Sequence, residues 1–231
     1  MVISSFKGEV GRKVIHVFIL IFPCAYFFFT ILFSRLAGLL ALVAMLVAGI
    51  ILEYLRLERR ARLPVLSWLW DNFRREKEED QMGAEIYAML GVIVALAVFD
   101  IRVAVTAIMI TIFGDLAACL VGMRFGRIRP RFFSGKSIEG SAVALAVNLA
   151  VGFVLLRTYV GNSVWWMKAM QAQGALDSPG VFGEPLWTVI VFMAVVAAAD
   201  ELLISKISDN LTIPVISGFA GQVALLLTYP G

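Results

Sequence analysis

The chain is poor in charge, in cysteine and in histidine. Charged residues make up 16% of its 231 residues, whereas hydrophobic residues make up 61%. Soluble domains are typically about 45–50% apolar, so this composition and a mean hydropathy of +0.89 exclude an ordinary soluble protein. The two cysteines, Cys24 and Cys119, both lie in apolar runs. They argue against a disulfide framework and against a zinc site.

Long apolar runs are what the chain has instead. About 20 apolar residues cross the hydrocarbon core of a bilayer, and the backbone polar groups there must be satisfied within helices. The first run is too long for a signal peptide and no small-residue cleavage site follows it, so we interpret it as a mature span. The sequence predicts an all-α, polytopic integral membrane protein with about seven transmembrane helices: Val14–Phe33, Leu36–Leu55, Ala84–Phe99, Val103–Met123, Ser141–Val160, Leu186–Ser205 and Ile213–Tyr229.

The distribution of basic residues predicts the orientation of these spans. If the N-terminus is cytoplasmic, sixteen of the twenty Lys and Arg residues fall on the cytoplasmic side. The four left outside are Arg35, Arg102, Arg157 and Lys168. Cytoplasmic loops of membrane proteins carry an excess of Lys and Arg, so the pattern favours a cytoplasmic N-terminus and an external C-terminus.

A long connection on the predicted cytoplasmic side, at about 57–82, has a pattern of its own. One helical face of it carries Val65, Leu66, Leu69, Trp70 and Phe73, and a charged run follows. This pattern is typical of an amphipathic helix that lies in the membrane interface. With this segment included, we expect residues 1–231 to form a single membrane-embedded catalytic domain.

Among the carboxylates of the predicted spans, three are candidates for a functional role because charge is costly there. Asp115 lies in the fourth span, and Asp200 and Glu201 lie in the sixth. An ionised carboxylate there costs several kcal/mol unless it meets a cation, a partner or a wet cavity. All three are therefore functional candidates, with Asp115 and Glu201 ahead of Asp200. The alternative is a structural salt bridge or a helix-end residue that reaches water.

The stretch "FSGKSIEGSA" contains a Gly-Lys-Ser triplet that resembles a phosphate-binding loop. A Walker A motif needs a glycine five positions before Gly135, where this chain has Pro130, and it needs a preceding strand. The triplet is therefore not a Walker motif. Lys136 nevertheless matches phosphate oxygens, and Ser137 and Ser141 are suited to cap the next helix, whose N-terminal amides favour an anion.

Unusual polar clusters gather on the predicted cytoplasmic side. They open the first, third and fifth spans, end the fourth and join the sixth to the seventh, which predicts one composite site. Carboxylates in such a site are suited to hold magnesium together with substrate phosphates. His16, the only histidine, lies one turn after Arg12 at the membrane boundary, and a packed structural role for it competes with a functional one.

Four elements of the sequence, between residues 11 and 214, resemble the CTP-dependent lipid kinases. These are the dolichol kinase, phytol kinase and CTP-dependent diacylglycerol kinase group, which is distantly related to the phosphatidate cytidylyltransferases. The elements are "GRKVIH", "GDLAACLVGMRFGR", "GKSIEGS" and "SDNLTIP", and they occur in the family order.

The resemblance implies transfer of a phosphoryl group from CTP to the hydroxyl of a membrane lipid alcohol, such as a polyprenol, dolichol, phytol or geranylgeraniol. It implies catalytic roles for Asp115, Glu201 and Asp209, with Asp115 and Asp209 as Mg²⁺ ligands. The implied nucleotide-binding residues are Gly122, Gly126, Lys136, Ser137, Glu139, Gly140, Ser141 and Asn210. Further site candidates are Arg12, Lys13, His16 and Glu85.

Two other functions stay open. A CTP:phospholipid cytidylyltransferase would use the same nucleotide, but the long C-terminal Lys-Asp…Pro-Gly-His-Gly-Gly signature of that family is missing. A transporter with buried carboxylates would be expected to show matching interrupted halves, and the sequence has no such symmetry.

The expected partners are CTP, an isoprenoid or other lipid alcohol, and the bilayer, with no nucleic acid. The sequence leaves a homodimer open. If the protein is prokaryotic, we expect it to be multi-pass in the cytoplasmic membrane, with its active site facing the cytoplasm.

Overall fold

The computed structural model describes residues 17–58, 82–129, 136–157, 186–203 and 208–228. Within these ranges every regular element is a helix, which confirms the predicted all-α class. The elements are η1 (Val17–Leu20), α2 (Ile21–Leu32), α3 (Arg35–Leu57), α5 (Ala84–Val98), α6 (Ile101–Phe125), α7 (Ile138–Arg157), α9 (Trp187–Leu203) and α10 (Asp209–Thr228).

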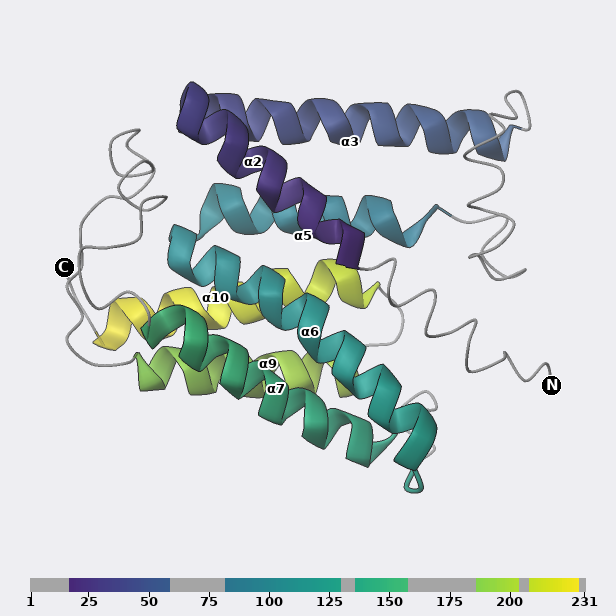
Figure 1. Ribbon diagram of the computed structural model, residues 1–231, viewed down its shortest axis with the longest axis vertical. Helices are drawn as coiled ribbons and strands as arrows, with labels where there is room; N and C mark the ends of the chain where they lie inside the picture. The colour runs from purple at the N-terminus through teal and green to yellow at the C-terminus, as the bar shows by residue number, and fades with distance from the viewer. Residues whose placement is uncertain (1–16, 59–81, 130–135, 158–185, 204–207, 229–231) are drawn as a thin grey trace.

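The helices form a bundle in which successive helices run in opposite directions (Figure 1). Helix α3 lies on one outer side, where it contacts both α2 and α5, and α2 runs diagonally in front of them in this view; α7 and α9 lie on the opposite side. The most extensive helix pairs are α6 with α7 and α9 with α10. As a consequence, the ends of α6 and α9 and the beginnings of α5, α7 and α10 lie at the same end of the bundle.

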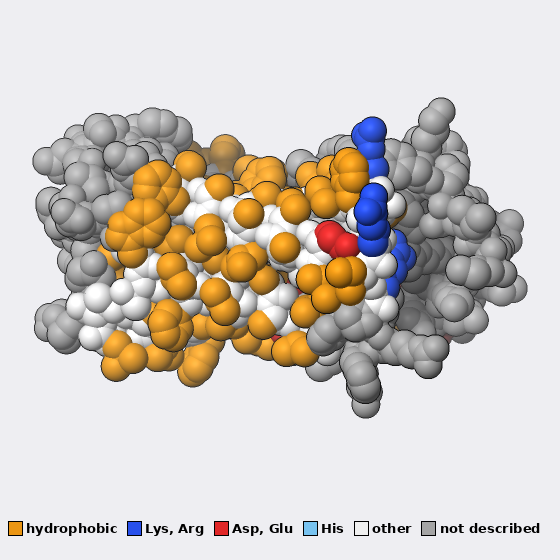
Figure 2. Space-filling view, turned by 90° about the horizontal axis from the view of Figure 1, so that it is seen from below, with side chains coloured by type: hydrophobic (Ala, Val, Ile, Leu, Met, Phe, Trp, Pro, Cys, Tyr) orange, Lys and Arg blue, Asp and Glu red, His pale blue; other side chains and the backbone are white. Residues whose placement is uncertain are grey.

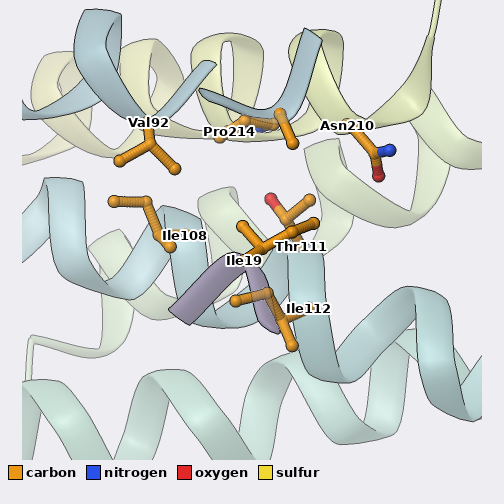
Figure 3. Close-up of a pocket in the computed structure, with 8 residues that line it drawn as sticks. Ile19, Val92, Ile108, Thr111, Ile112, Asn210 and Pro214 are labelled. Carbon is orange, nitrogen blue, oxygen red and sulfur yellow. The ribbon is translucent and has the colours of Figure 1, made fainter. Parts of the chain in front are cut away.

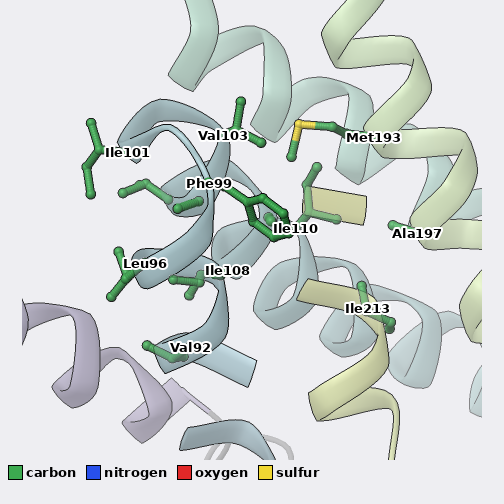
Figure 4. Close-up of a cluster of buried hydrophobic side chains, with 14 of the residues drawn as sticks. Val92, Leu96, Phe99, Ile101, Val103, Ile108, Ile110, Met193, Ala197 and Ile213 are labelled. Carbon is green, nitrogen blue, oxygen red and sulfur yellow. The ribbon is translucent and has the colours of Figure 1, made fainter. Parts of the chain in front are cut away.

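The interior of the bundle is packed with apolar side chains from α5, α6, α9 and α10 (Figure 4). Val103 and Met193 are fully buried in it, and Phe99 and Ile213 are nearly so. Large apolar side chains also cover the outside, including Phe28, Leu36, Val47, Phe192 and Leu227. An apolar surface around an apolar core is expected when lipid, rather than water, surrounds the helices.

Four helices are long and apolar enough to cross a membrane: Arg35–Leu57, Ile101–Phe125, Ile138–Leu156 and Asp209–Thr228. Ile21–Leu32 and Ala84–Val98 are shorter apolar helices. The lengths support a membrane protein, while the count of seven spans and the cytoplasmic N-terminus stay predictions. The interfacial segment predicted at about 57–82 falls almost wholly outside the described residues.

Several helices begin earlier than hydropathy predicts. Helix α7 begins at Ile138 instead of Ser141, because Ser137 Oγ accepts a hydrogen bond from the amide of Gly140 (3.1 Å). Helix α10 begins at Asp209 instead of Ile213, where the carbonyl of Ser208 accepts from Leu211 and Thr212. Capping by Ser137 fixes the start of α7, and in both helices polar motif residues lie on the first helical turn.

Candidate nucleotide and lipid site

Lys136 joins three helices at this end of the bundle. It directly precedes α7, and its ammonium donates a hydrogen bond to the backbone carbonyl of Glu201 on α9. It also forms an ion pair with Asp209 on the first turn of α10, with 2.7 Å between Nζ and Oδ2. Both side chains of this pair are 27% exposed. Residues that the sequence placed in separate motifs therefore share one cation.

Ser137 lies where α6 and α7 approach each other most closely. Its side chain is buried and caps α7. A Cβ on Gly126 would lie 2.6 Å from Ser137 Oγ, and one on Gly122 would lie 2.9 Å from it. A Cβ on Gly140 would lie 2.8 Å from the carbonyl oxygen of Ala118. These three glycines, predicted to bind nucleotide, therefore make room for helix packing, and their nucleotide contacts stay predictions.

Ser141 continues the same first turn of α7. Its hydroxyl donates to the carbonyl of Ser137 (3.3 Å), and its amide bonds the same carbonyl (3.1 Å). The capping role predicted for Ser137 is confirmed by the structure. Ser141 instead bonds back into the helix, so its predicted role as a cap is wrong.

Glu139 fastens the segment after α6 to the start of α7. Its Oε1 accepts hydrogen bonds from the backbone amides of Arg127 and Ile128, both at 3.0 Å. The carbonyl of Ile128 accepts in turn from the amide of Ile138 (3.1 Å). Arg129 donates to the carbonyl of Gly122 near the end of α6 (3.1 Å). The Gly-Arg and Lys-Ser-x-Glu-Gly-Ser elements are thus one connected unit.

Basic side chains gather at the same end of the molecule. Arg124, Arg127 and Arg129 are exposed. Figure 2 shows the described Lys and Arg side chains at one end of a face that is otherwise mainly apolar. Such a cluster suits the phosphates of a nucleotide, and it also suits an anchor at a membrane surface.

Asp200 is a buried carboxylate that the sequence ranked below its neighbour. It is 5% exposed, and its Oδ2 accepts a hydrogen bond from Thr212 Oγ1 on α10 (2.7 Å). Its Oδ1 is buried and has no hydrogen-bond partner among the described residues. The charged groups that act on it are Lys136 and Asp209. Glu201, the favoured candidate, is also buried.

Asn210 connects the start of α10 to the start of α5. Its side-chain amide donates to the carbonyl of Ala84 (3.4 Å). The next residue of α5, Glu85, is exposed. Beside Asn210 lies a small, mainly apolar pocket between η1, α5, α6 and α10 (Figure 3). Its lining is Ile19, Ala88, Val92, Ile108, Thr111, Ile112, Asn210 and Pro214.

Asp115 lies on α6, about one turn beyond this pocket. Thr111 lines the pocket, and Asp115 follows it by four residues, which puts both on one helical face about 6 Å apart along the axis. Asp115 is half-buried. The α6 carboxylate therefore lies on the face that lines the pocket, toward the end of the bundle where Lys136 lies.

The described part of the chain has no dense cluster of metal-ligating side chains. No group of three or more His, Cys, Asp or Glu residues there is arranged to hold a metal. Mg²⁺ does not need such a cage, because it is usually held by one or two carboxylates plus substrate phosphates and water. The oxygen donors around Lys136 fit that pattern, whereas a site for zinc would need more protein ligands.

Three candidate residues, Arg12, Lys13 and His16, lie outside the described residues. Asn148 is among the buried polar residues that the sequence reasoning did not single out. Asn148 in the middle of α7 is 2% exposed, and its Oδ1 has no hydrogen-bond partner among the described residues. A Cβ on Gly114 would lie 2.3 Å from that oxygen. A polar residue within an apolar span was the available signal.

Comparison with known proteins gives four similar curated sequences. A protein named CTP-dependent diacylglycerol kinase 1 from Schizosaccharomyces pombe is 26% identical over 162 residues, covering 68% of this chain and 69% of that protein. An uncharacterized protein of Methanocaldococcus jannaschii is 28% identical over 214 residues, covering 91% of each chain.

A second protein named CTP-dependent diacylglycerol kinase 1, from Eremothecium gossypii, is 26% identical over 222 residues, covering 91% of this chain and 65% of that protein. No family model and no solved structure matches the chain. The similarities confirm the predicted resemblance to CTP-dependent lipid kinases and support membership of that family.

Proposed function

We propose that this protein, as a relative of the CTP-dependent lipid kinases, transfers the γ-phosphoryl group of CTP to the hydroxyl of a membrane lipid alcohol. The observation that carries the proposal is the meeting of the motifs at one end of the bundle. Lys136, just before α7, donates hydrogen bonds both to the Glu201 carbonyl on α9 and to Asp209 on α10. Glu139 and Ser137 attach the glycine-containing end of α6 to the same place.

Phosphoryl transfer needs positioning, neutralisation of charge and a group that takes the hydroxyl proton. Lys136 is the proposed clamp on the CTP phosphates, two residues before the start of α7, where the positive end of the helix dipole also favours an anion. Ser137 and Glu139 hold the start of α7 in place. Arg127 and Arg129 lie on the adjoining segment and add positive charge.

Carboxylates supply the remaining roles. Asp115 and Asp209 are the proposed Mg²⁺ ligands, and the ion would neutralise charge on the transferred phosphoryl group. Glu201 or Asp209 takes the proton of the attacking hydroxyl, and the two assignments stay open. The oxygen-only donor set is of the kind that Mg²⁺ prefers.

The identity of the lipid acceptor is the most specific part of the proposal. The exposed apolar side chains on the outside of the helices give a lipid acceptor a hydrocarbon environment from which to approach the site. Three of the similar proteins are named for diacylglycerol, so diacylglycerol is the first acceptor to test. The isoprenoid alcohols predicted from the sequence are the second. The single catalytic domain, the multi-pass arrangement in a cell membrane and the cytoplasmic site remain part of this proposal, and a homodimer stays open.

Purified protein in lipid nanodiscs, given γ-labelled CTP and Mg²⁺, tests the reaction class. Diacylglycerol, a polyprenol, dolichol, phytol and geranylgeraniol are supplied one at a time, with phosphatidate as a separate acceptor. The proposal expects label in the product of at least one alcohol. Labelled pyrophosphate with phosphatidate would indicate a cytidylyltransferase instead. A folded protein that turns over no CTP with any acceptor would contradict both enzymatic functions and leave the transporter hypothesis.

A further inference from the structure

Oxygen atoms bind the Lys136 ammonium, as they usually bind a cation in a protein. Its ammonium contacts the carbonyl of Glu201 and Oδ2 of Asp209. Asp200 is a second carboxylate on which the charges of Lys136 and Asp209 both act. A backbone carbonyl and two carboxylates are hard oxygen donors, which are the ligands that Mg²⁺ takes in proteins.

Asp200 is built into this place and keeps one oxygen available. Thr212 donates to Oδ2 (2.7 Å) and fixes the carboxylate between α9 and α10. Oδ1 is buried and has no hydrogen-bond partner among the described residues. A buried carboxylate oxygen without a partner is costly, so the arrangement favours a further positive charge.

In the described part of the chain, the carboxylates of Asp200 and Asp209 both interact with the ammonium of Lys136. Replacing a monovalent ammonium by a divalent cation would neutralise both carboxylates. It would also free the Lys136 side chain, just before α7, to bind a phosphate.

We propose that Asp200, Asp209 and the Glu201 carbonyl form a divalent-cation site in which the Lys136 ammonium is the resident counter-ion. The cation takes the position of the ammonium, and Lys136 then binds the nucleotide phosphates. Thr212 is a positioning residue, because it acts through Asp200. The inference deepens the proposed function and rests on it, and it adds Asp200 to the cation ligands.

Binding of Mn²⁺ alone, followed by the electron paramagnetic resonance signal of the free ion, tests the site without any turnover. We expect Asp200→Asn and Asp209→Asn each to raise the Mn²⁺ dissociation constant at least tenfold. Asn at position 200 still accepts from Thr212, so the fold is expected to survive. Glu58→Gln removes an exposed carboxylate from the end of α3 and is the matched control, with a change of less than twofold.

Lys136→Met gives the most distinctive result, because it should tighten Mn²⁺ binding by removing the competing ammonium. Thr212→Val should weaken Mn²⁺ binding less than Asp200→Asn does. Wild-type affinity in folded Asp200→Asn, weaker binding in Lys136→Met, or no Mn²⁺ binding by the wild type would overturn the inference. If Asp200→Asn does not fold, Lys136→Met and Thr212→Val decide the question.

The γ-label experiment separates this inference from the proposed function. Transfer of label to an alcohol together with unchanged Mn²⁺ affinity in Asp200→Asn would leave the kinase standing and remove the site. The expected Mn²⁺ pattern without any transfer would leave the cation site and remove the kinase.

Discussion

Replacing Gly140 by alanine tests whether the glycines of the predicted nucleotide site are there for helix packing. The added Cβ would lie 2.8 Å from the carbonyl oxygen of Ala118 and 3.0 Å from Ser137 Oγ. Ordinary contacts begin at 3.4 Å, so the overlap with the α6 backbone is about 0.6 Å. A backbone oxygen cannot rotate away, and α6 and α7 would have to separate.

The magnitude follows from two opposing terms. Overpacking typically costs about 1–3 kcal/mol, whereas alanine is favoured over glycine in a helix by about 1 kcal/mol. We therefore expect Gly140→Ala to lower the free energy of unfolding by up to about 2 kcal/mol. Gly152→Ala is the control on the same helix, because the nearest atom to its Cβ is a side-chain methyl, Ile190 Cγ2 at 3.0 Å, and not a backbone atom.

Thermal melting in detergent and CTP binding by calorimetry are the two measurements. Gly140→Ala should melt below the wild type, and it should also bind CTP more weakly because Lys136 and Ser137 directly precede the displaced turn. Gly152→Ala should melt at or above the wild type and keep its CTP affinity. If Gly140→Ala melts like the wild type and loses CTP affinity alone, the glycine serves the ligand directly and the packing argument is wrong.

Three further predictions concern the charged residues and the orientation. Lys136→Met should lower kcat/KM for CTP at least tenfold, as expected for loss of a charge-assisted contact of about 1.5–3 kcal/mol. Lys136→Arg should recover only part of this kcat/KM. A greater loss in Arg129→Met than in Lys136→Met would contradict the proposed role of Lys136. Asp115→Asn should abolish most lipid phosphorylation and leave the melting temperature near that of the wild type, and near-normal turnover at saturating Mg²⁺ would exclude a metal role. A cysteine at Ser208 should react with a membrane-impermeant maleimide from the cytoplasmic side alone, and labelling from outside would overturn the predicted orientation.

The helices were predictable because hydropathy is a local property of the chain. Each predicted span overlaps a described helix, and α3, α5 and α6 match within two residues at each end. The start of α7 was missed because it depends on a cap formed by Ser137, and the start of α10 because its first turn is largely polar and lies outside the apolar run. The first predicted span, Val14–Phe33, contains the short helix η1 followed by a helix of 12 residues.

The pairing of charges was not predictable from the sequence. Lys136 and Asp209 are 73 residues apart, and only the packing of α7, α9 and α10 brings them together. The choice between Asp200 and Glu201 has a similar cause. Adjacent residues point about 100° apart around a helix, so the sequence alone does not reveal which one bonds Thr212.

Small residues in a membrane-embedded site can serve either helix packing or phosphate binding. Helices that pack within a bilayer approach each other at glycine, alanine and serine, and loops that bind phosphate use glycine and serine for close backbone approach. In this chain Gly122, Gly126 and Gly140 accommodate Ser137 and the backbone of the neighbouring helix, so their spacing is explained without a ligand. Packing does not explain Lys136 in the same way, because an ammonium that serves only to join helices does not need a second carboxylate beside it with a buried, unpartnered oxygen. The evidence for a nucleotide site therefore rests on Lys136, Asp200 and Asp209 more than on the glycines that first suggested it.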